Sequence, residues 1–334
     1  MKTTTIADVA DYAKVSKSTV SQFLNKRYDY MAVKTKEKIE LAIKELGYQP
    51  NIVARSLKQK STTTIGVIVA NILHEFSTQV IRAIEDVCNE LDFHIIVCNA
   101  DDEPIKEKKY IEMLRAKQVD GIIVFPTGDN IELYERMVDK DYPIVFLDRR
   151  IPEVPVSSIM LHNEDAAALA VEEFISKGYE RIGIITPSTV NKVTPRLERI
   201  AGYKLALQKH NLPIVPAYIK SLAIHHVQEG LKEMLELPTP PDAILAMNDL
   251  ALIEILKYVK ENAMKIPEDI ALIGIDNVSF ASFYNPSLTT VAQPTFEMGK
   301  KAAELLLNKI KKINTGDSEE IYRFEPTLIR RSSC

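Results

Sequence analysis

Residues 61–334 alternate between short apolar runs and amphipathic helical patterns, and this alternation restricts the fold more than any other feature of the chain. The first apolar run, at 64–70, is rich in β-branched residues and is typical of a strand buried on both faces. Helical patterns near 76–91 and 104–117 flank the next strand, at 93–99. This order predicts an α/β domain with a parallel sheet.

The alternation starts again after residue 161. A helical pattern near 163–177 leads to a strand at 181–185, and further helix–strand pairs follow to about residue 275. Two α/β lobes in series predict a cleft between them, because ligands of open α/β sheets bind beyond the carboxyl ends of the strands. We expect a small-molecule site in that cleft.

Residues 1–60 carry three short helical patterns instead, at about 6–13, 16–25 and 35–46. Thr5 and Ser16 are typical N-caps of the first two. Only Lys14 and Val15 separate the first pattern from the second, so the chain must turn sharply there, as in a helix-turn-helix. We therefore expect an all-α head that precedes the two lobes.

Charge divides along the same boundary. Residues 1–60 hold 12 lysines and arginines against 6 acidic residues, whereas the other 274 residues hold 30 against 40. A basic head on an acidic body indicates that only the head contacts a polyanion, although solvated lysine-rich helices would give the same balance. Lys17, Ser18, Ser21 and Gln22 lie on the polar face of the second helical pattern, and Gln can read adenine in the major groove. The alternative is a three-helix packing module with a polar outer face.

Neither a membrane segment nor a secretory signal is expected. No apolar run approaches the roughly 18 residues of a membrane helix, and the first ten residues include Asp8 and no long apolar stretch. Cys88, Cys98 and Cys334 lack metal-ligand spacing, so we interpret them as reduced thiols. These features predict a cytoplasmic protein without a bound metal.

Polar residues and one aromatic residue gather at or shortly after the ends of the expected strands. They are Asn71, His74, Phe76, Thr127, Asp148, Arg149, Arg150, Arg196, Arg199, Asn248, Asp276 and Gln293. Acids, amides and arginines beside an aromatic face form a plausible site for a polyol. Each has a structural alternative: Asp148 could cap a helix, and Arg196 and Arg199 could belong to a solvated face.

An enzyme would need a catalytic or cofactor motif. The sequence has no Gly-x-Gly-x-x-Gly, no P-loop and no Gly-x-Ser-x-Gly, and its histidines fall into no triad or zinc spacing. A sugar kinase or dehydrogenase would require a nucleotide site. A freestanding sugar-binding protein would require a signal peptide and would leave residues 1–60 without a role. We therefore expect neither an enzyme nor a cofactor.

The head resembles that of the lactose/galactose repressor family. Residues 5–10 read TIADVA, 13–16 read AKVS, and 18–25 read STVSQFLN. The resemblance implies DNA contacts from Thr5, Lys17, Ser18, Thr19, Ser21, Gln22 and Asn25. The chain departs from the family pattern at Lys14, where Gly is usual, at Gln22, where Arg is common, and in the longer loop that carries Tyr28 and Tyr30. These tyrosines could contact phosphates or pack on the third helix.

The same resemblance divides the chain into a head at 1–46, a hinge at 47–60 and an effector-binding and dimerisation domain at 61–334. In the hinge it implies that Leu57 wedges between base pairs of the minor groove, with Asn51, Ala54 and Arg55 close to groove and backbone. The alternative is a linker with one frayed helical turn. The effector domain would have the periplasmic sugar-binding fold.

In that fold the chain crosses between lobes three times, which we expect near Leu161, Val291 and Tyr322. The first lobe would then span about 61–161 and 291–321, and the second about 162–290 and 322–334. A homodimer on a two-fold operator is implied.

For the effector site, the resemblance implies effector contacts most directly at Arg199, Asn248 and Asp276. It implies them less directly at Phe76, Thr127, Asp148, Arg196 and Gln293, because loop lengths vary there. Residues 55–62 and 17–22 also resemble repressors of 2-keto-3-deoxygluconate utilisation, which implies a sugar-acid effector. A carboxylate requires a bidentate cation, and four arginines near the cleft offer positive charge.

Overall fold

The computed structural model describes residues 4–29, 31–49, 61–190, 193–313 and 319–334. The chain forms two compact units, Met1–Thr62 and Thr63–Cys334. Within the described ranges, no helix is both long enough and apolar enough to cross a membrane.

Residues 4–29 and 31–49 of the first unit form the helices α1 (Ile6–Ala13), α2 (Lys17–Leu24) and α3 (Val33–Leu46). The apolar side chains of all three helices meet in one small core, and its fully buried members include Val9, Val20 and Ile39. Helix α3 begins two residues before the predicted start and ends, as expected, at Gly47 in the left-handed conformation. The sequence-based prediction of an all-α head is confirmed.

The first lobe of the second unit is built on a six-stranded parallel sheet in the order β11-β5-β4-β3-β1-β2. Its strands are β1 (Thr64–Val69), β2 (His94–Asn99), β3 (Gly121–Val124), β4 (Ile144–Leu147), β5 (Ser158–Leu161) and β11 (Ile321–Phe324). Its helices are α5 (Glu75–Glu90), α6 (Pro104–Ala116), α7 (Ile131–Val138) and α12 (Thr295–Ile310). The buried β1, β3 and β4 carry the continuous apolar runs expected of strands covered on both faces.

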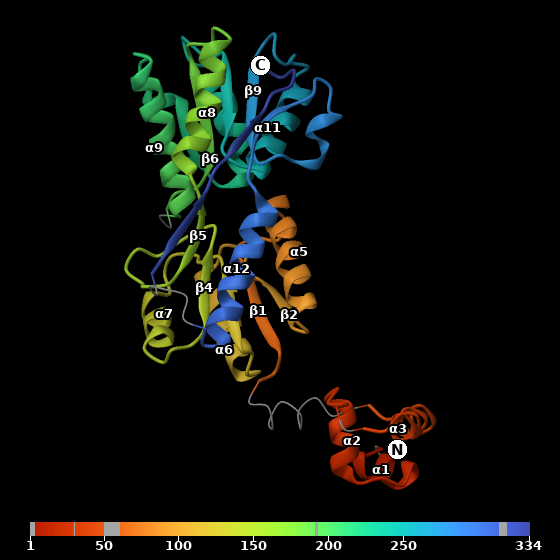
Figure 1. The fold of residues 1–334 in the computed structure, drawn as a ribbon. Helices are drawn as coiled ribbons and strands as arrows, with labels where there is room; N and C mark the ends of the chain where they lie inside the picture. The colour runs from red at the N-terminus through yellow and green to blue at the C-terminus, as the bar shows by residue number, and fades with distance from the viewer. Residues whose placement is uncertain (1–3, 30, 50–60, 191–192, 314–318) are drawn as a thin grey trace. The chain divides into compact units, whose positions relative to one another are not determined.

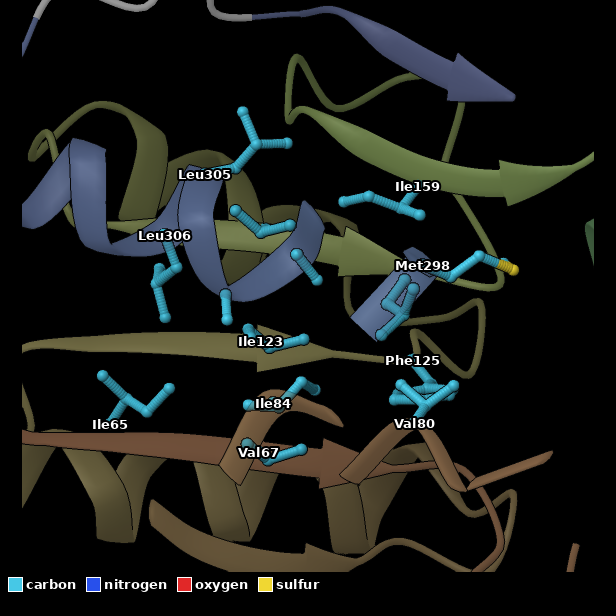
Figure 2. Packing of buried hydrophobic residues seen from close by; sticks show 14 of the residues in the cluster. Ile65, Val67, Val80, Ile84, Ile123, Phe125, Ile159, Met298, Leu305 and Leu306 are labelled. Atoms are coloured by element: carbon cyan, nitrogen blue, oxygen red, sulfur yellow. The ribbon is translucent and has the colours of Figure 1, made fainter. Parts of the chain in front are cut away.

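Helices from opposite ends of this unit's sequence cover one face of the sheet together. Helices α5 and α12 lie side by side in Figure 1 and pack against each other. Figure 2 shows Val80 and Ile84 of α5 and Met298 and Leu306 of α12 pointing into the same layer as Ile65 of β1. Helices α6 and α7 supply the core of the opposite face.

The second lobe repeats this architecture in the order β12-β10-β9-β8-β6-β7. Its strands are β6 (Ile182–Pro187), β7 (Ile219–Leu222), β8 (Ala243–Ala246), β9 (Ala271–Ile275), β10 (Thr289–Ala292) and β12 (Thr327–Ile329). All are parallel except β12, which runs antiparallel to β10. Its helices are α8 (Asn163–Ser176), α9 (Thr194–Lys209), α10 (Val227–Leu235) and α11 (Asp249–Glu261), with short 3-10 turns at Pro216–Tyr218, Ile224–His226 and Ser279–Ser282.

The chain crosses between the lobes after β5, after β10 and after β11. Strand β5 ends at Leu161, strand β10 keeps the chain in the second lobe to Ala292, and β11 keeps it in the first lobe to Phe324, which pairs with Leu161. The expected crossings were near Leu161, Val291 and Tyr322. Tyr322 itself lies on β11, in the first lobe.

Helix α9 approaches α8 closely enough to exclude any side chain at Gly202. A Cβ atom there would lie 2.1 Å from the carbonyl oxygen of Glu164. This close packing fixes the N-terminal half of α9, which carries Arg196 and Arg199, against the start of α8 next to the first crossing. The glycine thus sets the position of two residues that the sequence placed in the cleft.

Candidate DNA-binding face and effector cleft

The turn between α1 and α2 has the tight geometry that a helix-turn-helix requires. Lys14 adopts a left-handed conformation, with φ of 56°, and its N–H donates to the last carbonyls of α1. The family's usual glycine suits this conformation without strain, whereas lysine tolerates it at some cost. Ser16 then caps α2, because its hydroxyl accepts the N–H of Thr19 at 3.1 Å.

The predicted DNA contacts separate into two groups by their local bonding. Lys17, Ser18 and Gln22 are exposed on α2, and Ser21 is half-buried on the same helix. The other three take part in caps or helix ends. The Thr5 hydroxyl forms a capping box with Asp8, the Thr19 hydroxyl lies 2.8 Å from that of Ser16, and the Asn25 amide donates to the carbonyl of Ser21 at 2.7 Å.

The long loop after α2 packs onto the head. The Tyr28 ring meets the Phe23 ring edge-on, with centroids 5.8 Å apart, and the Lys36 ammonium of α3 lies 4.5 Å from the Tyr28 ring centre. Of the two roles considered for this tyrosine, packing on the third helix is the one that the structure contains. Tyr30 and the four hinge residues, Asn51, Ala54, Arg55 and Leu57, lie outside the described residues.

The cleft lies between the two lobes, at the carboxyl ends of their strands, and encloses about 50 Å³. It is lined by Ala70, Asn71, His74, Phe76, Ser77, Phe125, Asp148, Arg149, Thr186, Pro187, Val193, Pro195, Arg196, Arg199, Met247, Asn248, Asp276 and Gln293. Seven of the eight predicted effector residues are in this set, and only Thr127 is missing. The aromatic wall is formed by Phe76 and Phe125, whose ring centres lie 6.2 Å apart.

Thr127 is absent from the cleft wall because a buried acid of α6 binds its loop. The Thr127 N–H donates to Glu107 at 2.7 Å, and the same carboxyl accepts the Asn130 amide and the Tyr134 hydroxyl, each at 2.7 Å. Burial raises the pKa of Glu107, although these hydrogen bonds oppose the shift. No pattern in the sequence indicated that Glu107 is fully buried.

Arg199, Asn248, Asp276 and Gln293 converge in the second lobe. The Arg199 guanidinium donates to the Met247 carbonyl at 2.5 Å, and the Gln293 amide donates to Asp276 at 2.6 Å. Asn248 caps α11 through the N–H of Ala251. Buried oxygens of Gln293 and Thr186 have no hydrogen-bond partner among the described residues. Unpaired buried polar atoms are costly unless a ligand or water satisfies them.

Asp276 is the most strongly perturbed acid of the cleft. Burial, and then the negative charge of Asp249, raise the pKa of Asp276 to about 6, while Arg199 and the Gln293 amide act against this shift. A carboxyl with a pKa of about 6 is half protonated near pH 6, where it can either accept or donate a hydrogen bond. That versatility suits recognition of a hydroxyl group.

A contact that we did not predict joins the two lobes across the cleft mouth. His74, which precedes α5, contacts the carboxylate of Asp249 at the start of α11, and the Glu75 N–H donates to the same carboxylate at 2.8 Å. Glu75 in turn accepts the Ser279 N–H at 2.9 Å. Burial alone would lower the pKa of His74, but the hydrogen bond and charge of Asp249 raise it overall.

Asp102 is a second residue that we did not predict. It follows β2, and its carboxylate accepts from Arg149 at 2.6 Å and from Arg196 at 3.1 Å. The arginines near the cleft are therefore not the uncompensated positive charge that we expected. Arg150 does not line the cleft, and its carbonyl instead accepts the Thr194 hydroxyl at 2.9 Å.

The sequence and the fold are matched by known proteins. The model of the bacterial regulatory proteins of the lacI family matches residues 5–51, and that of the periplasmic binding protein-like domain matches residues 171–334. A probable HTH-type transcriptional regulator, EndR of Paenibacillus polymyxa, is 50% identical over 99% of this chain and 98% of its own length. The chain belongs to the lacI family.

A second relative by sequence and one solved structure agree with the assignment to the lacI family. The HTH-type transcriptional regulator KdgR of Bacillus subtilis (strain 168) is 32% identical over 99% of this chain and 97% of its own length. The crystal structure of the Lac repressor dimer bound to operator and the anti-inducer ONPF superposes with a TM-score of 0.86, at 25% identity, and covers 99% of each chain. This lacI-family protein is a DNA-binding transcriptional regulator.

A chain of hydrogen bonds links the cleft of this lacI-family regulator to its crossing strands. Arg199 donates to Asn163 at 2.9 Å, and the Asn163 amide donates to Glu198 at 3.0 Å. Glu198 accepts two N–H groups of Arg323, at 3.1 and 2.8 Å. Asn163 follows the first crossing and Arg323 precedes the third, so hydrogen bonds connect the cleft-lining Arg199 to both crossings.

Proposed function

We propose that this lacI-family regulator binds operator DNA as a homodimer and that a sugar-like effector in the cleft changes its operator affinity. The observation that best supports the proposal is the presence in one chain of an exposed polar α2 and a cleft lined by Arg199, Asn248 and Asp276. The polar face of α2 is suited to contact DNA, and the cleft is suited to bind a polyol. We further propose that the regulator works in the cytoplasm and has no catalytic activity.

In the proposed DNA complex, α2 enters the major groove. Gln22 reads a base edge, because its side-chain amide can pair with adenine in a bidentate way, while Lys17 contacts the phosphate backbone. One head buries too little surface for a tight operator complex, so two heads related by a two-fold axis bind two half-sites. In solution, light scattering should accordingly give twice the mass of one chain.

In the proposed effector complex, ligand hydroxyls satisfy the unpaired oxygens of Gln293 and Thr186, and Phe76 covers the apolar face of the sugar. Ligand binding changes the angle between the lobes at the three crossings. Because Arg199 is bonded through Asn163 and Glu198 to Arg323, its reorientation by ligand is transmitted to those strands.

The proposed DNA complex predicts that substitutions of two exposed residues of α2 affect DNA binding differently. Gln22→Ala should relax the preference at one base pair by ~1–3 kcal/mol, because a base contact is lost. Lys17→Ala should weaken all sequences alike and flatten the salt dependence, because a phosphate contact is lost. Fluorescence anisotropy with operator variants, at several salt concentrations, measures both. If the two substitutions gave the same uniform loss, Gln22 would not read a base.

The proposed function as a whole is tested by a titration of the purified protein. Operator affinity is measured with a panel of neutral sugars and sugar acids. A change in affinity with one class supports control by the cleft. Failure of the protein to distinguish an operator from random DNA would rule out the DNA part of the proposal. Specific binding that no sugar or sugar acid alters would rule out only the effector part.

A further inference from the structure

Asp102 brings two arginines from opposite lobes onto one carboxylate. Arg149 follows β4 of the first lobe, and Arg196 lies near the start of α9 in the second. Each donates to a different oxygen of Asp102, at 2.6 and 3.1 Å. Arg149 and Arg196 both line the cleft, whereas Asp102 is not among its lining residues. One carboxylate thus joins two cleft-lining arginines from opposite lobes.

The hydrogen bonds of this pair are incompletely satisfied, although Asp102 and Asp148 balance its charge. The Arg149 side chain is 7% exposed, and its buried Nε has no hydrogen-bond partner among the described residues. The next acid, Asp148, lies 3.4 Å from that nitrogen, at the long limit of a hydrogen bond. Burial, and then the charge of Arg149, lower the pKa of Arg196, while Asp102 and Asp148 act in the opposite direction. An anion that replaced the Asp102 carboxylate would meet two buried guanidinium groups that can donate to it.

The Asp102 side chain can leave the arginines without unfolding its loop. It is 30% exposed, while the Asp102 backbone N–H is fixed by the Ala70 carbonyl. The neighbouring Asp101 ties the loop down separately, through the amide of Asn99 and the ammonium of Lys106. Rotation of the Asp102 carboxylate toward solvent therefore costs the two ion pairs but not the local fold.

We propose that the effector carries a carboxylate that binds Arg149 and Arg196 in place of Asp102, and that Asp102 is the residue that sets the cleft's affinity for anions. This inference rests on the proposed function and specifies its effector as a sugar acid. A planar carboxylate matches the fork of a guanidinium with two parallel N–H···O bonds. The hydroxyl end of the ligand then faces Asn248, Asp276 and Gln293. Asp102 acts as a resident competitor, so its removal strengthens anion binding.

The test is calorimetry on the full chain with matched sugars. D-Glucose and D-glucuronate differ only in a hydroxymethyl or carboxylate at C6, and D-galactose and D-galacturonate form a second pair. The parent should bind at least one uronate more tightly than its neutral partner. Asp102→Asn should bind that uronate at least tenfold more tightly than the parent does and bind the neutral sugar with less than a twofold change. Arg196→Gln should lose the preference for the uronate.

Asp101→Asn is the matched control, because it removes the same charge from the same loop without touching either arginine. It should leave uronate affinity within about twofold of the parent. Unchanged or weaker uronate binding by Asp102→Asn would overturn the inference, as would equal tightening of the neutral sugar or no binding of either uronate. Tighter binding of D-glucose 6-phosphate than of D-glucuronate would assign the site to phosphate instead.

These outcomes also separate the inference from the function on which it rests. If a neutral sugar shifts operator affinity while no uronate binds, the proposed function stands and the carboxylate site fails. If the protein binds no operator specifically, the proposed function itself fails, whatever the calorimetry gives.

Discussion

Replacing Arg199 with alanine is expected to lower effector affinity at least 100-fold while leaving operator affinity in the absence of effector unchanged. The guanidinium is 6% exposed, lines the cleft and donates to Asn163 and to the Met247 carbonyl. Its loss removes a charged ligand contact and leaves two buried acceptors without their donor, each costing about 1–3 kcal/mol. Calorimetry with the sugar or uronate that binds the parent measures the effect.

Two further variants separate ligand binding from folding. Arg199→Lys keeps the charge but loses the fork of donors, so it should keep the fold and still lose most of the affinity. Lys209→Ala, on the same helix, removes an exposed cation that pairs with Glu172 and should change nothing. Parent-like effector affinity in Arg199→Ala would show that the ligand does not bind at this end of the cleft.

Asp276→Asn is expected to stabilise the effector domain at neutral pH and to abolish its effector response. Burial raises the pKa of Asp276 from 3.8 to about 6, so the native state holds this proton more tightly than the unfolded chain does. The carboxyl therefore costs the native state nothing below about pH 4. The cost grows between pH 4 and 6 and reaches about 3 kcal/mol above that range. Asparagine removes the cost, and its side-chain oxygen can still accept from Gln293.

Thermal unfolding against pH measures this effect. The melting temperature of Asp276→Asn minus that of the parent should be near zero at pH 4 and should reach on the order of 5–10 °C at pH 8. The His74–Asp249 pair is present in both proteins, but the charge of Asp276 contributes to the raised pKa of His74, so a part of the difference reports this coupling. The exposed Asp129→Asn is the matched control and should give no such rise. A difference that does not vary with pH would contradict the buried, raised-pKa carboxyl.

Local features of this chain could be predicted because their causes lie within a few residues. Thr5 and Ser16 cap the helices that they precede, and the two residues between α1 and α2 leave room for only a sharp turn. The alternation of buried strands and helices likewise requires two parallel-sheet lobes, and strand-end polar residues must meet at their carboxyl edges. Asn248 and Asp276 reach the cleft for this reason, and Arg199 reaches it from the N-terminal half of α9.

The residues that escaped prediction act through contacts distant in sequence. Asp102 lies 47 residues from Arg149 and 94 from Arg196, and His74 lies 175 from Asp249. The position of an aspartate after a strand does not indicate which arginine it will pair with. Thr127 was placed in the cleft because it follows β3, and only the buried Glu107 explains why its loop is bound to α6 and the start of α7 instead.

The most direct test of control by the cleft is reciprocity. Operator affinity is measured with and without saturating effector, and effector affinity is measured with and without saturating operator. Because the two equilibria are linked, the ratio of operator affinities must equal the product of the ratios of effector affinity at the two clefts of the dimer, and a 100-fold ratio of operator affinities corresponds to a coupling of about 2.7 kcal/mol. We expect this equality with an operator ratio well above one for the parent, and no shift of operator affinity in Arg199→Ala at the same effector concentration. Operator affinity that stays constant while the effector saturates the cleft would contradict allosteric control.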